Sequence, residues 1–158
     1  MPPRATQTDS PDKQLAAFIA RFTPEIAAQA RAVLAKLKRR LPGAVRLIYD
    51  NYNALAIGFG PSERASEAIF SIAVFPRWVS LFFLQGARLT DPQRLLKGSG
   101  SQVRHVVLAG ASDLDTPGIE ALIAQALQRA KLPIDAHQRG RLVIKSVSAK
   151  QRPRRPPG

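Results

Sequence analysis

The spacing of hydrophobic residues along the chain changes near residue 44. Before that point, apolar side chains recur every three or four positions, as on one face of a helix. They are Leu15, Phe18, Ile19, Phe22, Ile26, Ala30, Val33, Leu34, Leu37 and Leu41. At residues 10–11 and 23–24 a hydroxyl residue precedes a proline, which is typical of a helix start. The pattern predicts a short helix from about residue 11, a break at residue 23 and a longer helix up to residue 41.

After residue 44 apolar residues alternate with polar or small ones, which is the period of a strand. The expected strands are residues 44–50, 55–60, 68–75, 78–84 and 103–109. Short breaks between the first four favour antiparallel neighbours, because parallel strands need a long crossover. A second helical stripe follows residue 116, and residues 141–147 suit an edge strand. The sequence therefore predicts an α+β fold: an antiparallel sheet of about five strands with N-terminal and C-terminal helices packed on it.

Charge is distributed unevenly along the 158 residues, which carry 24 Lys and Arg against 11 Asp and Glu. After residue 138 there are seven cations and no acid: Arg139, Arg141, Lys145, Lys150, Arg152, Arg154 and Arg155. We divide the chain into a disordered segment at 1–13, one domain at 14–138 and a basic tail at 139–158. The last ten residues are expected to be unstructured. Such a tail either binds nucleic acid by counterion release or keeps the protein soluble.

Several classes of protein are disfavoured by what the sequence lacks. There is no Cys, which excludes disulfides, thiolate chemistry and Cys-based zinc sites. No apolar run is long enough to span a membrane, and the N-terminus has no signal-peptide core, so we expect a cytoplasmic protein without a membrane partner. No nucleophile motif or metal-spaced cluster occurs. The sequence predicts no catalytic residue, metal or cofactor, and favours a binding domain over an enzyme.

The segment "LLKGSGSQVRH" at residues 95–105 is the first candidate site. Its glycines free the backbone to approach a ligand, its hydroxyls donate hydrogen bonds, and its cations attract anions. The residues proposed to bind are Lys97, Ser99, Ser101, Arg104 and His105. The lysine precedes the glycines and no helix follows, unlike a P-loop. Two interpretations stay open: a pocket for an anion or small molecule, and an ordinary loop that leads into a strand.

The segment "YDNYN" at residues 49–53 is the second candidate. Asparagines tolerate left-handed backbone conformations, so the segment favours a hairpin turn. If this turn lies close to the 97–101 loop, Tyr49, Tyr52 and Asn53 line one end of a pocket, with Trp78 as a wall.

The adjacent Phe82 and Phe83 fall on opposite faces of one expected strand. The predicted helices cover only one of those faces. We therefore expect a second subunit to cover the other face, which makes the protein a homodimer.

Two long segments carry a resemblance to a known family. They are "FTPEIAAQARAVLAKLKRRLPGAVRLIYDNYNALAIGFG" and "AIFSIAVFPRWVSLFFLQGARLTDPQRLLKGSGSQVRHVVL". With the C-terminal helix, over residues 14–131, the chain resembles the YdhG-like family of small, mostly bacterial domains of unknown function. That family is distantly linked with frataxin-like proteins. The resemblance implies the same α+β fold and, as one alternative function, frataxin-like iron handling.

Overall fold

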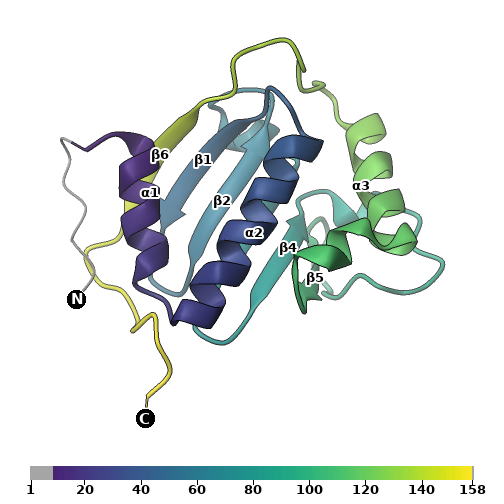
Figure 1. The fold of residues 1–158 in the computed structure, drawn as a ribbon. Helices are drawn as coiled ribbons and strands as arrows, with labels where there is room; N and C mark the ends of the chain where they lie inside the picture. Colours follow the sequence, from purple (N-terminus) through teal and green to yellow (C-terminus); the bar gives the residue numbers. More distant parts are fainter. Residues whose placement is uncertain (1–8, 158) are drawn as a thin grey trace.

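The computed structural model describes residues 9–157, and these form three α-helices and six strands (Figure 1). The helices are α1 (Pro11–Ala20), α2 (Pro24–Arg40) and α3 (Pro117–Arg129). The strands are β1 (Val45–Asp50), β2 (Leu55–Gly60), β3 (Phe70–Val74), β4 (Val79–Phe83), β5 (Arg104–Leu108) and β6 (Leu142–Val147). The segment expected to be disordered, 1–13, lies mostly outside the described residues, and its described end already belongs to α1.

Both N-terminal helices begin where the sequence predicts. The Ser10 hydroxyl accepts a hydrogen bond from the Lys13 N–H at 3.2 Å, and the Thr23 hydroxyl accepts one from the Ile26 N–H at 3.3 Å. Each cap satisfies one backbone donor that the first helical turn leaves without a partner. The predicted break at residue 23 is confirmed, because Thr23 has an extended backbone between the two helices.

The sheet has the strand order β5-β4-β3-β2-β1-β6. Neighbouring strands are antiparallel except β6, which runs parallel to β1. The predicted α+β class is confirmed, with one strand more than the expected five. The sixth, β6, is the edge strand expected at residues 141–147, so this part of the 139–158 segment belongs to the sheet and is not a tail.

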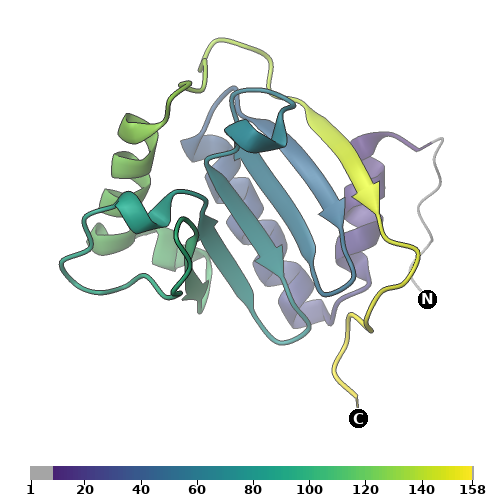
Figure 2. The same cartoon turned by 180° about the vertical axis from the view of Figure 1, so that it is seen from behind.

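The two faces of the sheet differ in what covers them. A row of buried apolar residues crosses five strands and faces the helices: Ile48, Ile57, Ile72, Leu81 and Val106. The neighbouring row points to the other face, and its central side chains are small. Ala56, Ala73 and Ser80 lie in this row between Tyr49 and Val107. Among the described residues no α-helix covers this open face, and only the short η1 (Ala65–Glu67) and the 84–103 connection lie at its rim (Figure 2).

Two charged residues of β1 fall in rows that face the helices. Arg46 is paired with the buried Phe59, and Asp50 with the buried Leu55. Burial lowers the pKa of Arg46, while the nearby Asp12 carboxylate of α1 raises it. Arginine nevertheless keeps its proton in proteins. Asp50 is only 1% exposed, so its charge requires cationic partners from elsewhere in the chain.

The connection between α3 and β6 returns the chain to the far edge of the sheet. It lies against the turn that joins α2 to β1, where Gly43 has a φ of +84°. A side chain at Gly43 would place its Cβ 2.0 Å from the Asp135 carbonyl oxygen. The Gln138 amide donates to the carbonyl oxygens of Gly43 and Pro61, at 2.7 and 3.1 Å. These contacts position the start of β6 beside the edge of β1 that β2 leaves unpaired.

Candidate functional site

The residues expected to form one pocket lie at two different corners of the sheet. The β1–β2 turn shares its end of the sheet with the β3–β4 turn and the C-terminal segment (Figures 1 and 2). The 97–101 loop precedes β5 at the opposite end. Since β1 and β5 are four strand spacings apart, the two corners are separated by about 19 Å across the sheet alone. The turn therefore does not approach the 97–101 loop, and the condition for one pocket formed by both segments is not met.

The 97–105 segment folds back on itself. The backbones of Lys97 and His105 exchange two hydrogen bonds of 2.8 and 2.9 Å in an isolated antiparallel bridge. The His105 ring stacks on Phe82 with 5.0 Å between centroids, on the open face of the sheet. Ser99 and Ser101 are exposed. The bridge covers the outer edge of β5, which gives the segment a structural role.

Arg104 is partly engaged within its own loop. Its guanidinium donates hydrogen bonds to the carbonyl oxygens of Gly100 and Val103 in its own loop. Both bonds come from Nη1, and the Nε and Nη2 donors form no bond with the described residues. The anion pocket at residues 97–105 stays a prediction.

The "YDNYN" segment forms the predicted hairpin turn. The Asn51 N–H donates to the Ala54 carbonyl oxygen at 3.0 Å, which closes residues 51–54 between β1 and β2. The turn borders an open hollow of about 500 Å³, which we call the turn hollow. It is lined by Asn51, Tyr52, Asn53, Ala54, Ala56, Phe75 and Ser148. Neither asparagine side chain hydrogen-bonds to any described residue, so both amides can accept and donate bonds to a ligand.

Two aromatic surfaces are exposed at the turn hollow. Tyr52 is 48% exposed, and Trp78 is 42% exposed. Trp78 stacks on Phe75, a wall of the hollow, with 4.8 Å between centroids and 23° between the ring planes. Tyr49 lies behind them, half-buried, and its hydroxyl is buried without a hydrogen-bond partner among residues 9–157. Of the predicted residues, the structure therefore brings Tyr49, Tyr52, Asn53 and Trp78 to one end of the sheet.

Residues 148–157, which we call the C-terminal arm, run along this same end of the sheet. The Ser148 N–H donates to the Asp50 carbonyl oxygen, and the Arg152 N–H to the Tyr52 carbonyl oxygen, each at 2.9 Å. The Arg152 guanidinium lies over the Tyr52 ring, 5.7 Å from its centroid. The prediction that the last ten residues are unstructured is thus wrong for their described part, because the arm satisfies backbone carbonyls of β1 and its turn.

Arg154 is the most deeply buried part of the arm, at 3% exposure. Its guanidinium donates to the Asp50 carboxylate at 2.9 Å and to the carbonyl oxygens of Asn51 and Tyr52 at 2.5 and 3.4 Å. Arg21 lies 3.5 Å from the other Asp50 carboxylate oxygen. A buried charge is tolerated only when it is paired and hydrogen-bonded. No local pattern in the sequence indicates this pair, because the alternation of Asp50 with Leu47 and Tyr49 suits a position on the polar side of the strand.

Other cations after residue 138 are also engaged. Arg141 pairs with the Glu63 carboxylate at 3.1 Å, and Lys145 donates to the Glu63 carbonyl oxygen. Arg155 donates to the carbonyl oxygens of Ala20 and Arg21 at the end of α1. The nucleic-acid prediction treated all seven cations as one mobile group, and at least these three, together with Arg154, are held by the folded domain.

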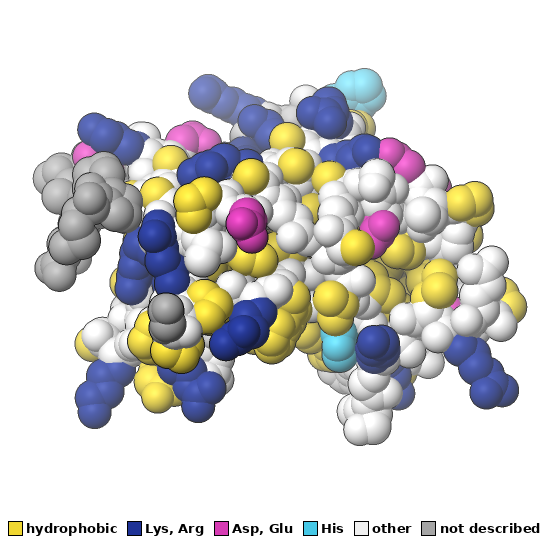
Figure 3. All heavy atoms as spheres, turned by 60° about the horizontal axis from the view of Figure 1, so that its bottom comes forward, with side chains coloured by type: hydrophobic (Ala, Val, Ile, Leu, Met, Phe, Trp, Pro, Cys, Tyr) yellow, Lys and Arg dark blue, Asp and Glu magenta, His cyan; other side chains and the backbone are white. Residues whose placement is uncertain are grey.

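The cations that remain exposed near the turn hollow are Arg77, Lys150 and Arg152. Lys150 forms no ion pair or hydrogen bond with the described part of the chain, and neither does Arg139 farther away. None of the residues that line the hollow is acidic. Figure 3 views this end of the molecule, where Lys and Arg side chains gather around the corner at which the chain ends, beside hydrophobic side chains. The turn hollow itself is lined by aromatic, small and uncharged polar residues, and exposed cations belong to the segments beside it.

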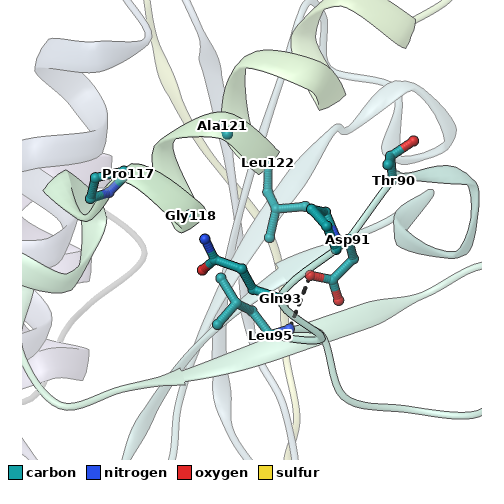
Figure 4. Close-up of a pocket in the computed structure, with 9 residues that line it drawn as sticks. Thr90, Asp91, Gln93, Leu95, Pro117, Gly118, Ala121 and Leu122 are labelled. Atoms are coloured by element: carbon teal, nitrogen blue, oxygen red, sulfur yellow. Dashed lines mark hydrogen bonds between the residues drawn. The ribbon is translucent and has the colours of Figure 1, made fainter.

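A second, smaller pocket of about 140 Å³ lies between the 90–95 loop and the start of α3 (Figure 4). The Asp91 carboxylate at its rim accepts hydrogen bonds from the backbone N–H groups of Leu95 and Leu96. The Gln125 amide bonds to both backbone groups of Thr90. Its polar groups hold the loop in place, and none of the predicted site residues lines it.

Residues 9–157 contain neither a cluster of metal ligands nor a membrane-spanning helix. No three His, Asp or Glu side chains come close enough together there to hold a metal ion. Within the same range no helix combines the length and the apolar character needed to cross a membrane.

Comparison of the chain with protein-family models, with curated proteins and with solved structures found no match. The resemblance to the YdhG-like family therefore stays a prediction, and the turn hollow is the candidate site that the geometry itself favours.

Proposed function

We propose that this protein binds single-stranded nucleic acid at the turn hollow. The observation that carries the proposal is the pairing of exposed aromatic faces with exposed cations at one end of an open sheet. Proteins that bind single strands combine aromatic side chains, on which bases stack, with a positively charged surface that follows the phosphates. The proposal moves the expected nucleic-acid contact from a mobile basic tail to a folded surface.

The aromatic groups supply the stacking surfaces. Tyr52 and Trp78 expose nearly half of their surface, although burying such rings is favourable. An unpaired base can lie on either ring, whereas a base inside a duplex has no free face to offer. The unbonded amides of Asn51 and Asn53 are placed to meet base edges or sugar hydroxyls beside those rings. This arrangement favours single strands over duplexes.

The cations supply attraction to the phosphates. The acid nearest the turn hollow, Asp50, is buried and neutralised by Arg154 and Arg21. The exposed Arg77, Lys150 and Arg152 therefore act without a competing carboxylate. The net charge of +13 adds a long-range attraction for any polyanion.

The test is binding of a labelled 15-nucleotide single strand, followed by fluorescence anisotropy across a salt series. Three phosphate contacts predict that the logarithm of affinity falls against the logarithm of salt concentration with a slope of about −2. Tyr52→Ala should weaken binding by about fivefold or more, since stacking contributes about 1–3 kcal/mol per base. The slope should not change, because no phosphate contact is lost.

Two variants control this experiment. Tyr52→Phe should bind nearly as well as the parent protein, because it keeps the stacking ring. Leu132→Ala removes an equally exposed side chain, 50% exposed, that does not line the hollow, and should change nothing. Equal affinity of the parent and Tyr52→Ala, or a duplex that binds more tightly than the single strand, would refute the proposal.

Other expectations from the sequence remain proposals of lower rank. A homodimer through the open sheet face would cover the half-buried Phe82 and the exposed Val107, and is checked by light scattering at high concentration. A monomeric mass there would count against it. Cytoplasmic location and a small-molecule or anion pocket at residues 97–105 likewise rest on the sequence. Frataxin-like iron handling rests on the family resemblance alone.

A further inference from the structure

We propose that Arg154 is the positioning residue of the turn hollow: from a buried site it fixes both the turn that carries Tyr52 and the arm that carries Arg152. This inference rests on the proposed function. Arg154 itself is 3% exposed, so it does not meet a ligand and must act through other residues. In this proposal Arg152 and Tyr52 contact the nucleic acid, and Arg154 holds these two residues in position.

The first step is the turn. The Arg154 guanidinium donates to the carbonyl oxygens of Asn51 and Tyr52, which are two successive residues of the β1–β2 turn. Its bond to the Asp50 carboxylate fixes the end of β1 directly before that turn. Arginine presents several donors in a rigid planar fork, which suits one side chain that must hold three acceptors. The turn that lines one side of the hollow is therefore held by one guanidinium.

The second step is the arm. Arg152 is exposed, and its long side chain would otherwise sample many rotamers. Two anchors restrict it: its own N–H bonds to the Tyr52 carbonyl oxygen, and Arg154 is buried only two residues farther along. Pro153 between them fixes its own φ and stiffens the connection. Arg152 is thereby held over Tyr52, so less ordering is required when a phosphate binds.

The experiment is a double-mutant cycle on the full chain, with the same labelled 15-nucleotide strand as the probe. Arg152→Ala should weaken binding about fivefold or more and reduce the steepness of the salt slope by about 0.7, because one phosphate contact is lost. Arg154→Ala should reduce the slope by the same amount, although Arg154 is buried. The double variant Arg152→Ala/Arg154→Ala should have the same slope as either single variant. Substitutions that act through one contact do not have additive effects.

Two further variants test whether the effect of Arg154→Ala on binding comes only from unfolding. Asp50→Leu with Arg154→Met replaces the ion pair by apolar groups of similar size, a change that folded proteins often tolerate. It keeps the core filled but removes the bonds to the turn carbonyls, so it should show the same loss of slope. Arg139→Ala, which removes an unbonded arginine of the same basic region, should leave the slope almost unchanged.

Limited trypsin digestion separates this inference from the proposed function. With the arm docked, the bond after Lys150 should be protected from cleavage, and Arg154→Ala should expose it. Additive slopes in the cycle, or an unchanged slope in the Asp50→Leu and Arg154→Met variant, would overturn the positioning role while nucleic-acid binding stands. A parent protein that binds no strand but shows the protected arm would overturn the proposed function, and with it the role of Arg154 in binding.

Discussion

Arg154→Ala should lower the free energy of unfolding by about 3–5 kcal/mol, because it leaves a buried carboxylate without its partner. Asp50 is 1% exposed, and its remaining cation, Arg21, lies 3.5 Å away on the solvent side. The substitution also removes the donor that serves the Asn51 and Tyr52 carbonyl oxygens. Urea denaturation followed by circular dichroism measures the change directly.

The adjacent Arg155 is the matched control for this prediction. It is exposed, and its guanidinium donates only to carbonyl oxygens at the end of α1. Arg155→Ala should therefore cost no more than about 1 kcal/mol, because water replaces the lost hydrogen bonds at an exposed site. Similar losses for the two variants would show that Arg154 is not buried in solution, and the docked arm would have to be rejected.

Phe83→Ala should be equally damaging, with a loss of about 3–5 kcal/mol, for a different reason. Phe83 lies on the helix side of β4, is almost fully buried and packs edge-to-face against Phe70 with 5.6 Å between centroids. Removing its ring leaves a cavity that the rigid sheet cannot fill. Thermal and urea unfolding should both report the loss.

Phe82, the preceding residue, provides the comparison within the same strand. It lies on the open face, is half-buried and stacks on His105. Phe82→Ala should cost only about 1 kcal/mol, the range of an aromatic pair that is partly solvated. If Phe82→Ala proved as costly as Phe83→Ala, the open face would have to be buried in solution, as the expected homodimer requires.

Local patterns were enough to predict most of the fold. The alternation in β1 to β5 and the caps at Ser10 and Thr23 depend on residues that are close in sequence. The parallel pairing of β6 with β1 could not be predicted in this way. Residues near 142 carry no local signal that β1, which ends at residue 50, has an unpaired edge. Lys145 and Ser146 also make the outer half of β6 polar and exposed, as edge strands often are.

The site was less predictable than the fold. A Pro- and Arg-rich end resembles a solvated tail, and the burial of Arg154 depends on Asp50, which is 104 residues away. The separation of the two proposed ligand-binding segments, in contrast, follows from the predicted meander. Its first and fifth strands run in the same direction, so the turn after one and the loop before the other must lie at opposite ends of the sheet.

The parallel pairing of β1 with β6 has a consequence for how the chain folds. During synthesis the first strand leaves the ribosome long before its outer neighbour, so its backbone groups along that edge stay unpaired while the middle of the protein forms. Contacts of such large sequence separation slow folding, and an open strand edge invites pairing with other chains. The nascent protein is therefore most prone to aggregate until residues 142–154 have emerged, and a chain stopped before them should need chaperones to stay dispersed.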